Sequence, residues 1–428
     1  MERNSHTFRT YQHAQEEAER CLYCYDAPCT AACPVHIDVP AFIAMIRSGN
    51  LLGSAGIVKS SNALANVCGK VCPEEIYCQS VCNRSFLDRP IRIRELHQFV
   101  TQHEARSGYQ PISKVVRSGA NVAVVGGGPS GLGCAFELSR LGHSVTVFDK
   151  GGLGGVPGKS IPLFRLSRQE VMDDLKFLSK NFRVERMNIE VAQFRQLRKD
   201  FDAVYVAIGL GKDRSLDLKG AKLNGVMPVI KFLEAAKRGK PLVGKRVVVI
   251  GGGNVSLDAA ATAKRAGARG VILIYRRSQN EMKVWKSEFE EARMQGAEIR
   301  LLTTPVEIVG SGFVTGVRCV RTTLSRKKDA SGRPIPVEVK GSEFEIEADT
   351  VIVAIGQVIG SGLAKMFKLN EKGLMSVDKK CRTSVQGVFA GGDAVSGEGT
   401  IVQSVAHGKQ AALAMDEYLR RRGGKGTK

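Results

Sequence analysis

The sequence predicts an α/β protein in which a helical, cysteine-rich N-terminal domain precedes two domains of parallel strands. Three observations indicate this. Eight of the 11 cysteines fall between residues 21 and 82. Asn121–Val125 has the composition of a buried strand and is followed by a glycine-rich turn and a helix of small residues. The same order recurs from Arg246–Ile250 onward.

The recurrence indicates an internal duplication of a Rossmann-like dinucleotide-binding domain. Similar strands, Ala203–Gly209 and Thr350–Gly356, follow the two copies. A further glycine-rich segment arrives only at Gly387–Asp393, so we expect the second copy to be inserted within the first. The expected domains are 1–115 (helical), 119–230 with 348–428 (first Rossmann-like domain, ending in a basic tail) and 231–347 (inserted domain). Residues 324–346, rich in charge and Gly/Pro, are expected to form an exposed hairpin or loop.

Composition narrows the location and the kind of partner. No apolar run reaches the ~20 residues of a membrane span. Residues 1–20 are polar, without the apolar core of a secretory signal, so we expect a cytoplasmic protein. The net charge of +21 favours an acidic partner subunit or a small electron carrier such as ferredoxin. Nucleic acid is a weaker alternative, because the basic residues are scattered and no basic helix carries interleaved aromatics.

The clustered cysteines indicate metal binding, because disulfides are rare in such a compartment. The first group has spacings of two, four and three residues and is followed by proline: Cys21, Cys24, Cys29, Cys33 and Pro34. The second group has spacings of three, five and three residues: Cys68, Cys72, Cys78 and Cys82. Close thiolates with Cys-Pro pairs favour two 4Fe-4S clusters. Zinc, or thiols without a metal, are the alternatives.

The remaining cysteines do not form a redox pair. Cys134, Cys319 and Cys381 are isolated, and none belongs to a C-x4-C motif. The sequence therefore argues against a dithiol mechanism of the thioredoxin-reductase type.

The first fingerprint is G-x-G-x-x-G, and its glycines allow a dinucleotide pyrophosphate to approach the start of the following helix. It comprises Gly126, Gly128, Pro129, Ser130 and Gly131. Asp149, at the end of the next strand, is expected to bind a ribose diol. The alternative is a structural domain that binds no ligand.

The segment Gly387–Asp393 resembles a strand and turn of flavoproteins with two dinucleotide sites. In that resemblance Gly392 and Asp393 contact the flavin, with Asp393 on its ribityl chain. The next helix begins near residue 403, and its N-terminus is expected to face the pyrimidine edge of the flavin and to stabilise the reduced anion. Its expected contact residues are Gln403, Ser404 and Val405. The first domain would then hold FAD.

The second fingerprint places Gly251, Gly253 and a small Ser256 at the corresponding positions, with Asn254 and Val255 opening the helix. The second strand of this copy ends in Arg276 and Arg277 instead of an acid. Arginines can bind a 2′-phosphate through two hydrogen bonds, so the pair favours NADPH over NADH. The alternative is a solvated strand end.

Taken in order, these motifs resemble the family of the glutamate synthase small subunit. That family also includes dihydropyrimidine dehydrogenase, its separate bacterial flavin subunit and the large subunit of electron-bifurcating ferredoxin–NADP oxidoreductases. The resemblance covers about residues 10–420 and includes Ile161–Leu166, where Arg165 is an expected cofactor contact, and the V-I-V-A-I-G-Q segment with Gly356. The amino-acid sequences of the cysteine segments and of Pro90–Val100 are most similar to those of the dihydropyrimidine dehydrogenase flavin subunit.

The resemblance also implies a ligand set. One cluster would be held by Cys21, Cys24, Cys29 and Cys82, and the other by Cys33, Cys72, Cys78 and a residue that is not cysteine. The matching position holds His97, where the family usually has Gln or Glu. Imidazole can ligate iron, and we expect His97 to be the eighth ligand. Gln98 or Cys68 is the alternative.

The expected function follows from these parts. NADPH would reduce FAD, and the flavin would release single electrons through the clusters to a partner subunit. No side-chain acid–base pair is required. One alternative is a glutamate synthase small subunit, and another is the large subunit of an electron-bifurcating ferredoxin–NADP oxidoreductase. The others are a stand-alone reductase of ferredoxin or sulfur species and a redox-sensing or nucleic-acid-binding flavoprotein.

Overall fold

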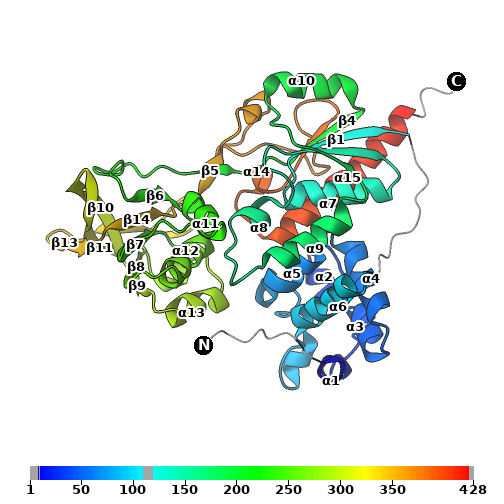
Figure 1. Cartoon of the computed structure of the whole chain (residues 1–428), viewed down its shortest axis with the longest axis horizontal. Helices are drawn as coiled ribbons and strands as arrows, with labels where there is room; N and C mark the ends of the chain where they lie inside the picture. Colours follow the sequence, from blue (N-terminus) through cyan, green and yellow to red (C-terminus); the bar gives the residue numbers. More distant parts are fainter. Residues whose placement is uncertain (1–7, 9, 109–118, 424–428) are drawn as a thin grey trace. The chain divides into compact units, whose positions relative to one another are not determined.

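The computed structural model describes residue 8 and residues 10–108 and 119–423. The chain forms two compact units (Figure 1). Unit 1 comprises Met1–Gly158, Phe164–Gly211 and Ile359–Lys428, and unit 2 comprises Lys159–Leu163 and Lys212–Val358. The chain therefore leaves unit 1 and returns to it, as an inserted domain requires. The crossings lie at residues 211 and 359 rather than at the expected 230 and 348, because the strands Val226–Pro228 and Thr350–Val353 pair within the sheet of the inserted domain.

The N-terminal part of unit 1 is helical, as expected. Its helices are α1 (Tyr11–Glu19), α2 (Pro28–Ala32), α3 (Val39–Arg47), α4 (Leu51–Ser61), α5 (Ala65–Val71), η1 (Glu74–Ile76), η2 (Asn83–Phe86) and α6 (Ile93–Ser107). Helix α3 illustrates the cause. The Asp38 side chain accepts a hydrogen bond from Ala41 N at its start, and apolar residues recur with helical spacing at Val39, Phe42 and Ile46, which are buried.

The rest of unit 1 is built on a parallel sheet. Its strand order is β16-β4-β1-β2-β3. The strands are β1 (Asn121–Val125), β2 (Ser144–Phe148), β3 (Arg183–Glu185), β4 (Ala203–Val206) and β16 (Val388–Ala390). The helices are α7 (Pro129–Arg140), α8 (Gly155–Lys159), α9 (Arg168–Leu178), α10 (Val191–Asp200), η4 (Gly362–Met366), α14 (Asp393–Ser396) and α15 (Ile401–Gly423). Every residue of β4 is buried, as expected for a strand covered on both faces.

Unit 2 repeats this topology, which confirms the duplication. Its parallel sheet has the order β6-β14-β7-β8-β9. The strands are β6 (Val226–Pro228), β7 (Arg246–Ile250), β8 (Gly270–Ile274), β9 (Glu298–Arg300) and β14 (Thr350–Val353). The helices are α11 (Val229–Lys237), α12 (Asn254–Arg265), η3 (Gln279–Glu281) and α13 (Lys286–Met294). Two short strands at the chain crossings pair with each other: β5 (Gly211–Asp213) and β15 (Gln357–Ile359).

An antiparallel sheet completes unit 2. It contains β10 (Thr303–Ser311), β11 (Phe313–Lys328), β12 (Pro334–Glu338) and β13 (Phe344–Glu347). Strands β11 and β12 form the hairpin expected from the Gly/Pro-rich composition of residues 324–346. No helix within residues 10–108 or 119–423 is both long and apolar enough to cross a lipid bilayer.

A buried carboxylate joins the helical N-terminal part of unit 1 to the part that is built on the parallel sheet. Asp174 of α9 accepts hydrogen bonds from Asn66 N (3.0 Å), Val67 N (2.9 Å) and Asn66 Nδ2 (3.0 Å). Helix α5 has no side-chain cap from its own segment, so Asp174 supplies the missing acceptor. Burial raises the pKa of Asp174 to about 6, against the lowering effect of these donors and of Lys59. The group is therefore an anion at neutral pH.

Replacing Asp174 by Ala should lower the stability of unit 1 by about 3 kcal/mol, because two buried N–H groups lose their acceptor. Calorimetric melting of the purified protein measures the change. Asp173→Ala is the matched control, since the Asp173 carboxylate accepts a hydrogen bond from its own helix, from Gln169 Nε2. The control should stay within about 0.5 kcal/mol of the parent protein. Equal effects of the two variants would contradict the role of the cap.

Candidate functional site

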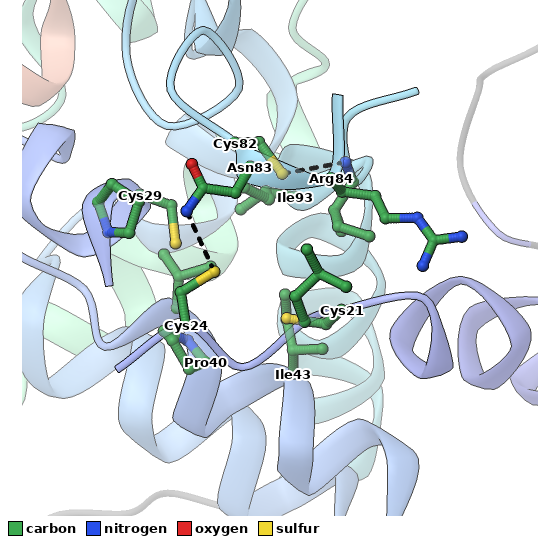
Figure 2. A pocket seen from close by; sticks show the side chains of 13 residues that line it. Cys21, Cys24, Cys29, Pro40, Ile43, Cys82, Asn83, Arg84 and Ile93 are labelled. Carbon is green, nitrogen blue, oxygen red and sulfur yellow. Dashed lines mark hydrogen bonds between the residues drawn. The ribbon is translucent and has the colours of Figure 1, made fainter. Parts of the chain in front are cut away.

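Four cysteines from separate segments line one pocket. Figure 2 shows the sulfur atoms of Cys21, Cys24, Cys29 and Cys82 turned toward a common space, whereas the guanidinium of Arg84 points away. The space free of atoms, open solvent at its mouth included, is about 360 Å³. Most of the remaining wall is apolar: Leu22, Pro28, Val39, Pro40, Ile43, Ile91 and Ile93. The structure thus brings together the thiols that the family resemblance assigns to one cluster.

Two N–H groups are directed at these sulfur atoms. Asn83 Nδ2 lies 3.4 Å from Cys24 Sγ, and the backbone N of Ile91 lies 3.5 Å from Cys82 Sγ. Such donors stabilise thiolate charge and tune the potential of an iron–sulfur cluster. Burial raises the pKa of Cys29 to about 12. Metal binding at this thiol therefore has to displace a proton.

The loop around the pocket contains unusual backbone conformations. Five non-glycine residues of the described chain have a left-handed φ, and three lie in or just after the first cysteine group: Tyr23 (49°), Ala27 (40°) and His36 (54°). Each such residue costs about 1–3 kcal/mol unless its surroundings impose the conformation. The surrounding structure therefore imposes these conformations on the loop that contains the first cysteine group.

The thiols of the second predicted site also lie together. The pKa of Cys72 is raised by burial and by the nearby charges of Cys68, Cys78 and Cys33. Burial, Glu74 and Cys33 likewise raise the pKa of Cys78. Cys33 therefore lies with the second group although it belongs to the first in sequence, and Cys82 does the reverse.

His97 of α6 has a buried ring with one unpaired nitrogen. Its side chain is buried, its ring is hydrogen-bonded to the backbone of Ala65, and Nε2 is buried without a hydrogen-bond partner. Burial lowers the pKa of His97 to about 4, so the ring is neutral. A neutral imidazole held by its other nitrogen presents a free lone pair, as metal-bound histidines do.

The two alternative ligands lie close to His97: Gln98 is the next residue of α6, and Cys68 is on the neighbouring helix α5. A Cβ added at Gly69, next to Cys68, would lie 3.0 Å from Gln98 Cα and 3.3 Å from His97 Cδ2. Gln98 Nε2 lies 3.5 Å from Glu170 Oε1. Burial raises the pKa of Cys68 to about 12, against the lowering effect of the Asn62 side chain and with smaller raising effects of the Asp174 and Cys33 charges.

The donor set of both groups fits iron–sulfur clusters. Half-buried and buried thiols, N–H donors and an apolar wall surround the first site, and an unpartnered imidazole nitrogen lies on α6. Among the residues that the structure describes, no three His, Cys, Asp or Glu side chains are close enough to hold a single metal ion. A cubane separates its thiolates more widely than one ion does, because the cluster lies between them.

The first fingerprint forms a phosphate-type turn at the start of α7. Gly126 has a φ of 110°, and an added Cβ would collide with the carbonyl of Ala207. A Cβ at Gly131 would collide with the carbonyl of Gly126. Helix α7 begins at Pro129, and its N-cap, Gly128, provides no side-chain acceptor. The first N–H groups are thus left for a pyrophosphate.

Asp149 follows β2 and is held beside this turn. Its carboxylate accepts hydrogen bonds from Gly127 N (2.8 Å) and Gly151 N (2.7 Å). The expected contact Arg165 is half-buried in the segment before α9. The acid thus has a fixed position at the strand end, as a ribose-binding residue needs.

Asp393 is the first residue of α14, which follows strand β16. Ser404 Oγ donates to Asp393 Oδ1 at 3.1 Å, and Gly392 has a φ of 67°. Burial raises the pKa of Asp393 to about 6. The side chain of Gln403 accepts a hydrogen bond from Thr400 N, and Thr400 Oγ1 accepts one from Gln403 N, as in a capping box at the start of α15.

Helix α15 packs closely on α7. A Cβ at Gly408 would collide with the carbonyl of Ser130, and one at Gly133 would lie 2.7 Å from the carbonyl of Val405. Ser130 Oγ also lies 2.7 Å from Tyr205 OH. These contacts bring the starts of both helices to the flavin-type site.

The second cysteine group contacts the start of α15. Tyr77, next to Cys78, has its hydroxyl 3.0 Å from Thr400 Oγ1. Lys409 Nζ lies 3.4 Å from the carbonyl of Val35. The thiols and the flavin-type turn are therefore joined within unit 1.

The second fingerprint repeats the first in unit 2. Helix α12 begins at Asn254, its N-cap Gly253 provides no side-chain acceptor, and Val255 packs against the core. Ser256 donates to the carbonyl of Gly253 at 2.6 Å. A Cβ at Gly251 would collide with the carbonyl of Ala354. The last expected contact, Gly356, follows β14 with a φ of 99°.

The two arginines after β8 have different environments. Arg276 is exposed, whereas Arg277 is buried. Arg277 Nη2 lies 2.6 Å from Asp329 Oδ2, and its Nε donates to the carbonyl of Pro334 at 2.8 Å. The structure therefore differs from the expectation that both guanidiniums are available to a ligand.

Both the cysteine-rich part and the remainder of the chain match known protein families. Residues 2–109 match the family described as dihydropyrimidine dehydrogenase domain II, 4Fe-4S cluster. Residues 120–412 match the pyridine nucleotide-disulphide oxidoreductase family. The chain is 33% identical to the NADPH glutamate synthase small chain of Escherichia coli K12, over 95% of this chain and 91% of the relative. This chain belongs to that family. It is an NAD(P)H-dependent flavin and iron–sulfur oxidoreductase.

Other members of the family are subunits of larger enzymes. The NAD-dependent dihydropyrimidine dehydrogenase subunit PreT of E. coli K12 is 34% identical, over 95% of this chain and 94% of the relative. The NADP(+)-dependent formate dehydrogenase subunit beta of Moorella thermoacetica is 37% identical over 92% of this chain. This chain spans 60% of that relative's length.

Solved structures share the fold of the flavin and nucleotide domains. FprA of Mycobacterium tuberculosis in complex with NADPH has a TM-score of 0.60 at 19% identity, over 72% of this chain and 86% of that one. Thioredoxin reductase of T. acidophilum has a TM-score of 0.54 at 23% identity, over 70% of this chain and 99% of that one.

Gly408→Ala should lower FAD retention, because its Cβ has to push α15 away from Ser130 of the fingerprint helix. A cost of about 1–3 kcal/mol is expected for such overpacking. The ratio of FAD absorbance to protein measures the effect. Gly362→Ala is the control, since a Cβ there meets no atom within 4 Å. Full FAD content in Gly408→Ala would show that the close helix contact does not shape the flavin site.

Proposed function

We propose that this chain takes electrons from NADPH through FAD and passes them singly through two 4Fe-4S clusters to a partner protein. FAD, when bound, converts a two-electron donor into single electrons, which the clusters can carry. The observation that carries the proposal is the direct contact between the second cysteine group and the start of α15, through Tyr77 and Thr400. It supports a route from the flavin site to that group of thiols.

The first pocket suits the exit of electrons. Its cysteines are flanked by Tyr25 and Phe86, the two most exposed large hydrophobic side chains among the described residues. The net charge of +21 supports an acidic partner. A partner subunit that carries the terminal active site, or ferredoxin, would meet both conditions.

The identity of the partner has two leading candidates among the relatives. The resemblance of the cysteine segments favours a dihydropyrimidine dehydrogenase, and the 34% identity to one of its subunits is in line with this. The 33% identity to a glutamate synthase small chain supports the second candidate. Isolation of the native complex from cells, followed by identification of the co-purifying subunit, decides between them.

For NADPH as donor, the exposed guanidinium of Arg276 at the end of β8 is the main support. The names of the relatives do not decide between NADPH and NADH, because the formate dehydrogenase subunit is NADP(+)-dependent and the dihydropyrimidine dehydrogenase subunit is NAD-dependent. The choice therefore rests on the site.

Anaerobically purified protein should contain about eight irons per chain, as two cubanes require, together with one FAD. Addition of NADPH should bleach the flavin absorbance and give cluster signals in electron paramagnetic resonance. NADH should act more slowly. Stoichiometric zinc without iron, or bleaching without any cluster signal, would contradict the proposed relay.

We further propose that His97 is the eighth ligand. Its unpartnered Nε2 supports this role, whereas Cys68 lies near the negative charge of Asp174. His97→Ala should alter one of the two cluster signals and remove up to about four irons per chain. Cys68→Ser and Gln98→Ala, the matched variants, should keep both signals. If Cys68→Ser alone changes a cluster, the thiol is the ligand instead.

A further inference from the structure

The hairpin of β11 and β12 is attached to the end of β8 by Arg277. Its buried guanidinium forms an ion pair with the Asp329 carboxylate at 2.6 Å and donates a hydrogen bond to the Pro334 carbonyl at 2.8 Å. Asp329 in turn accepts from the backbone N of Ser331 (2.8 Å) and of Arg333 (3.2 Å). The Arg277 side chain is buried and the Asp329 side chain is half-buried, so releasing this arginine to a ligand would leave a buried guanidinium without its hydrogen-bond partners.

The same attachment brings a second arginine to the end of β8. Arg333 Nη1 lies 3.5 Å from Tyr275 OH and 3.4 Å from the carbonyl of Glu281, and its Nε lies 2.9 Å from Ser331 Oγ. None of these partners is a carboxylate. Arg333 therefore reaches the strand end with its positive charge uncompensated.

Arg276 lies within electrostatic reach of this guanidinium. Partial desolvation and the charges of Arg277 and Arg333 lower the pKa of Arg276, against a smaller opposing effect of the Asp329 carboxylate. Within residues 119–423, the Arg276 guanidinium makes no hydrogen bond or ion pair, and the nearby acid, Asp329, is committed to Arg277. The guanidiniums of Arg276 and Arg333 are thus close together, and neither is paired with a carboxylate. Such an arrangement favours the binding of an anionic ligand to both.

The position of this pair matches one group of the nucleotide. In a Rossmann-like domain the end of the second strand faces the ribose 2′ position. Here that strand is β8, which follows β7 and α12 and ends at Ile274. An anion bound at this point would be a 2′-phosphate.

We propose that Arg276 and Arg333 together bind the 2′-phosphate of NADPH, and that Arg277 is a positioning residue that holds the hairpin and so places Arg333. This inference rests on the proposed function, because it specifies how the donor is selected. The hairpin is thereby a specificity element of the nucleotide site.

Calorimetric titration of the full-length holoprotein with 2′,5′-ADP and with 5′-AMP tests the proposal without turnover. Arg333→Ala and Arg276→Ala should each weaken 2′,5′-ADP binding by about tenfold or more, as expected for loss of a charge-assisted contact. Binding of 5′-AMP should change less than about twofold. Arg326→Ala, an exposed arginine on the same hairpin, is the matched control and should bind both ligands like the parent protein.

Arg277 is tested by a double-mutant cycle. Arg277→Ala should weaken 2′,5′-ADP binding in the parent protein and have no further effect in the Arg333→Ala background, because it acts through Arg333. Additive losses would mean that Arg277 touches the phosphate and would overturn its positioning role.

Two further results would overturn the proposal in distinguishable ways. If the parent protein binds 5′-AMP as tightly as 2′,5′-ADP, the preference for NADPH fails together with this inference. If the parent protein discriminates but Arg333→Ala does not reduce the discrimination, the hairpin has no part in it, and the proposed donor stands.

Discussion

The capping of α5 by Asp174 is the contact on which the arrangement of unit 1 depends. The carboxylate belongs to a helix of the flavin-type domain, and the backbone it satisfies belongs to the cysteine domain. Helix α5 contains Cys68 and ends at Cys72, so the cap fixes the second thiol group against the flavin-type sheet. A neutral cap would be less costly to bury. It would, however, accept fewer hydrogen bonds, and it would lack the favourable interaction of a negative charge with the positive N-terminal end of the helix dipole. Electron transfer over a fixed separation benefits from such a rigid join.

Much of the site was accessible from sequence because its motifs are local. Glycines at set spacings predict a turn, since the reason for each glycine lies within a few residues of it, as at Gly126 and Gly131. The duplication was equally visible from its strands. The pairing of thiols between the two groups was different: spacing alone would assign each group to its own site. The proline after Cys33 indicated that this thiol turns to the other cluster, and the full exchange of Cys33 and Cys82 came from the family resemblance.

What the sequence did not reveal depends on distant partners. Arg277 looked equivalent to Arg276, yet successive residues at a strand end point in opposite directions, and the partner of Arg277 lies on a hairpin that follows much later in the chain. The acceptor role of Asp174 for α5 was hidden for the same reason. Gln403 is the exception, because Thr-x-x-Gln before an apolar run is a capping-box signal that could have predicted its internal role.

The exchange of Cys33 and Cys82 has a consequence for folding. A centre bound at the first site would link residues 21–29 to residue 82, and one bound at the second would link residue 33 to residues 72 and 78. The two closed loops overlap in sequence, so each cross-link reduces the conformational entropy of the other loop in the unfolded chain. The segment between the two groups would then gain stability from either centre, and loss of one would loosen the loop that presents ligands to the other.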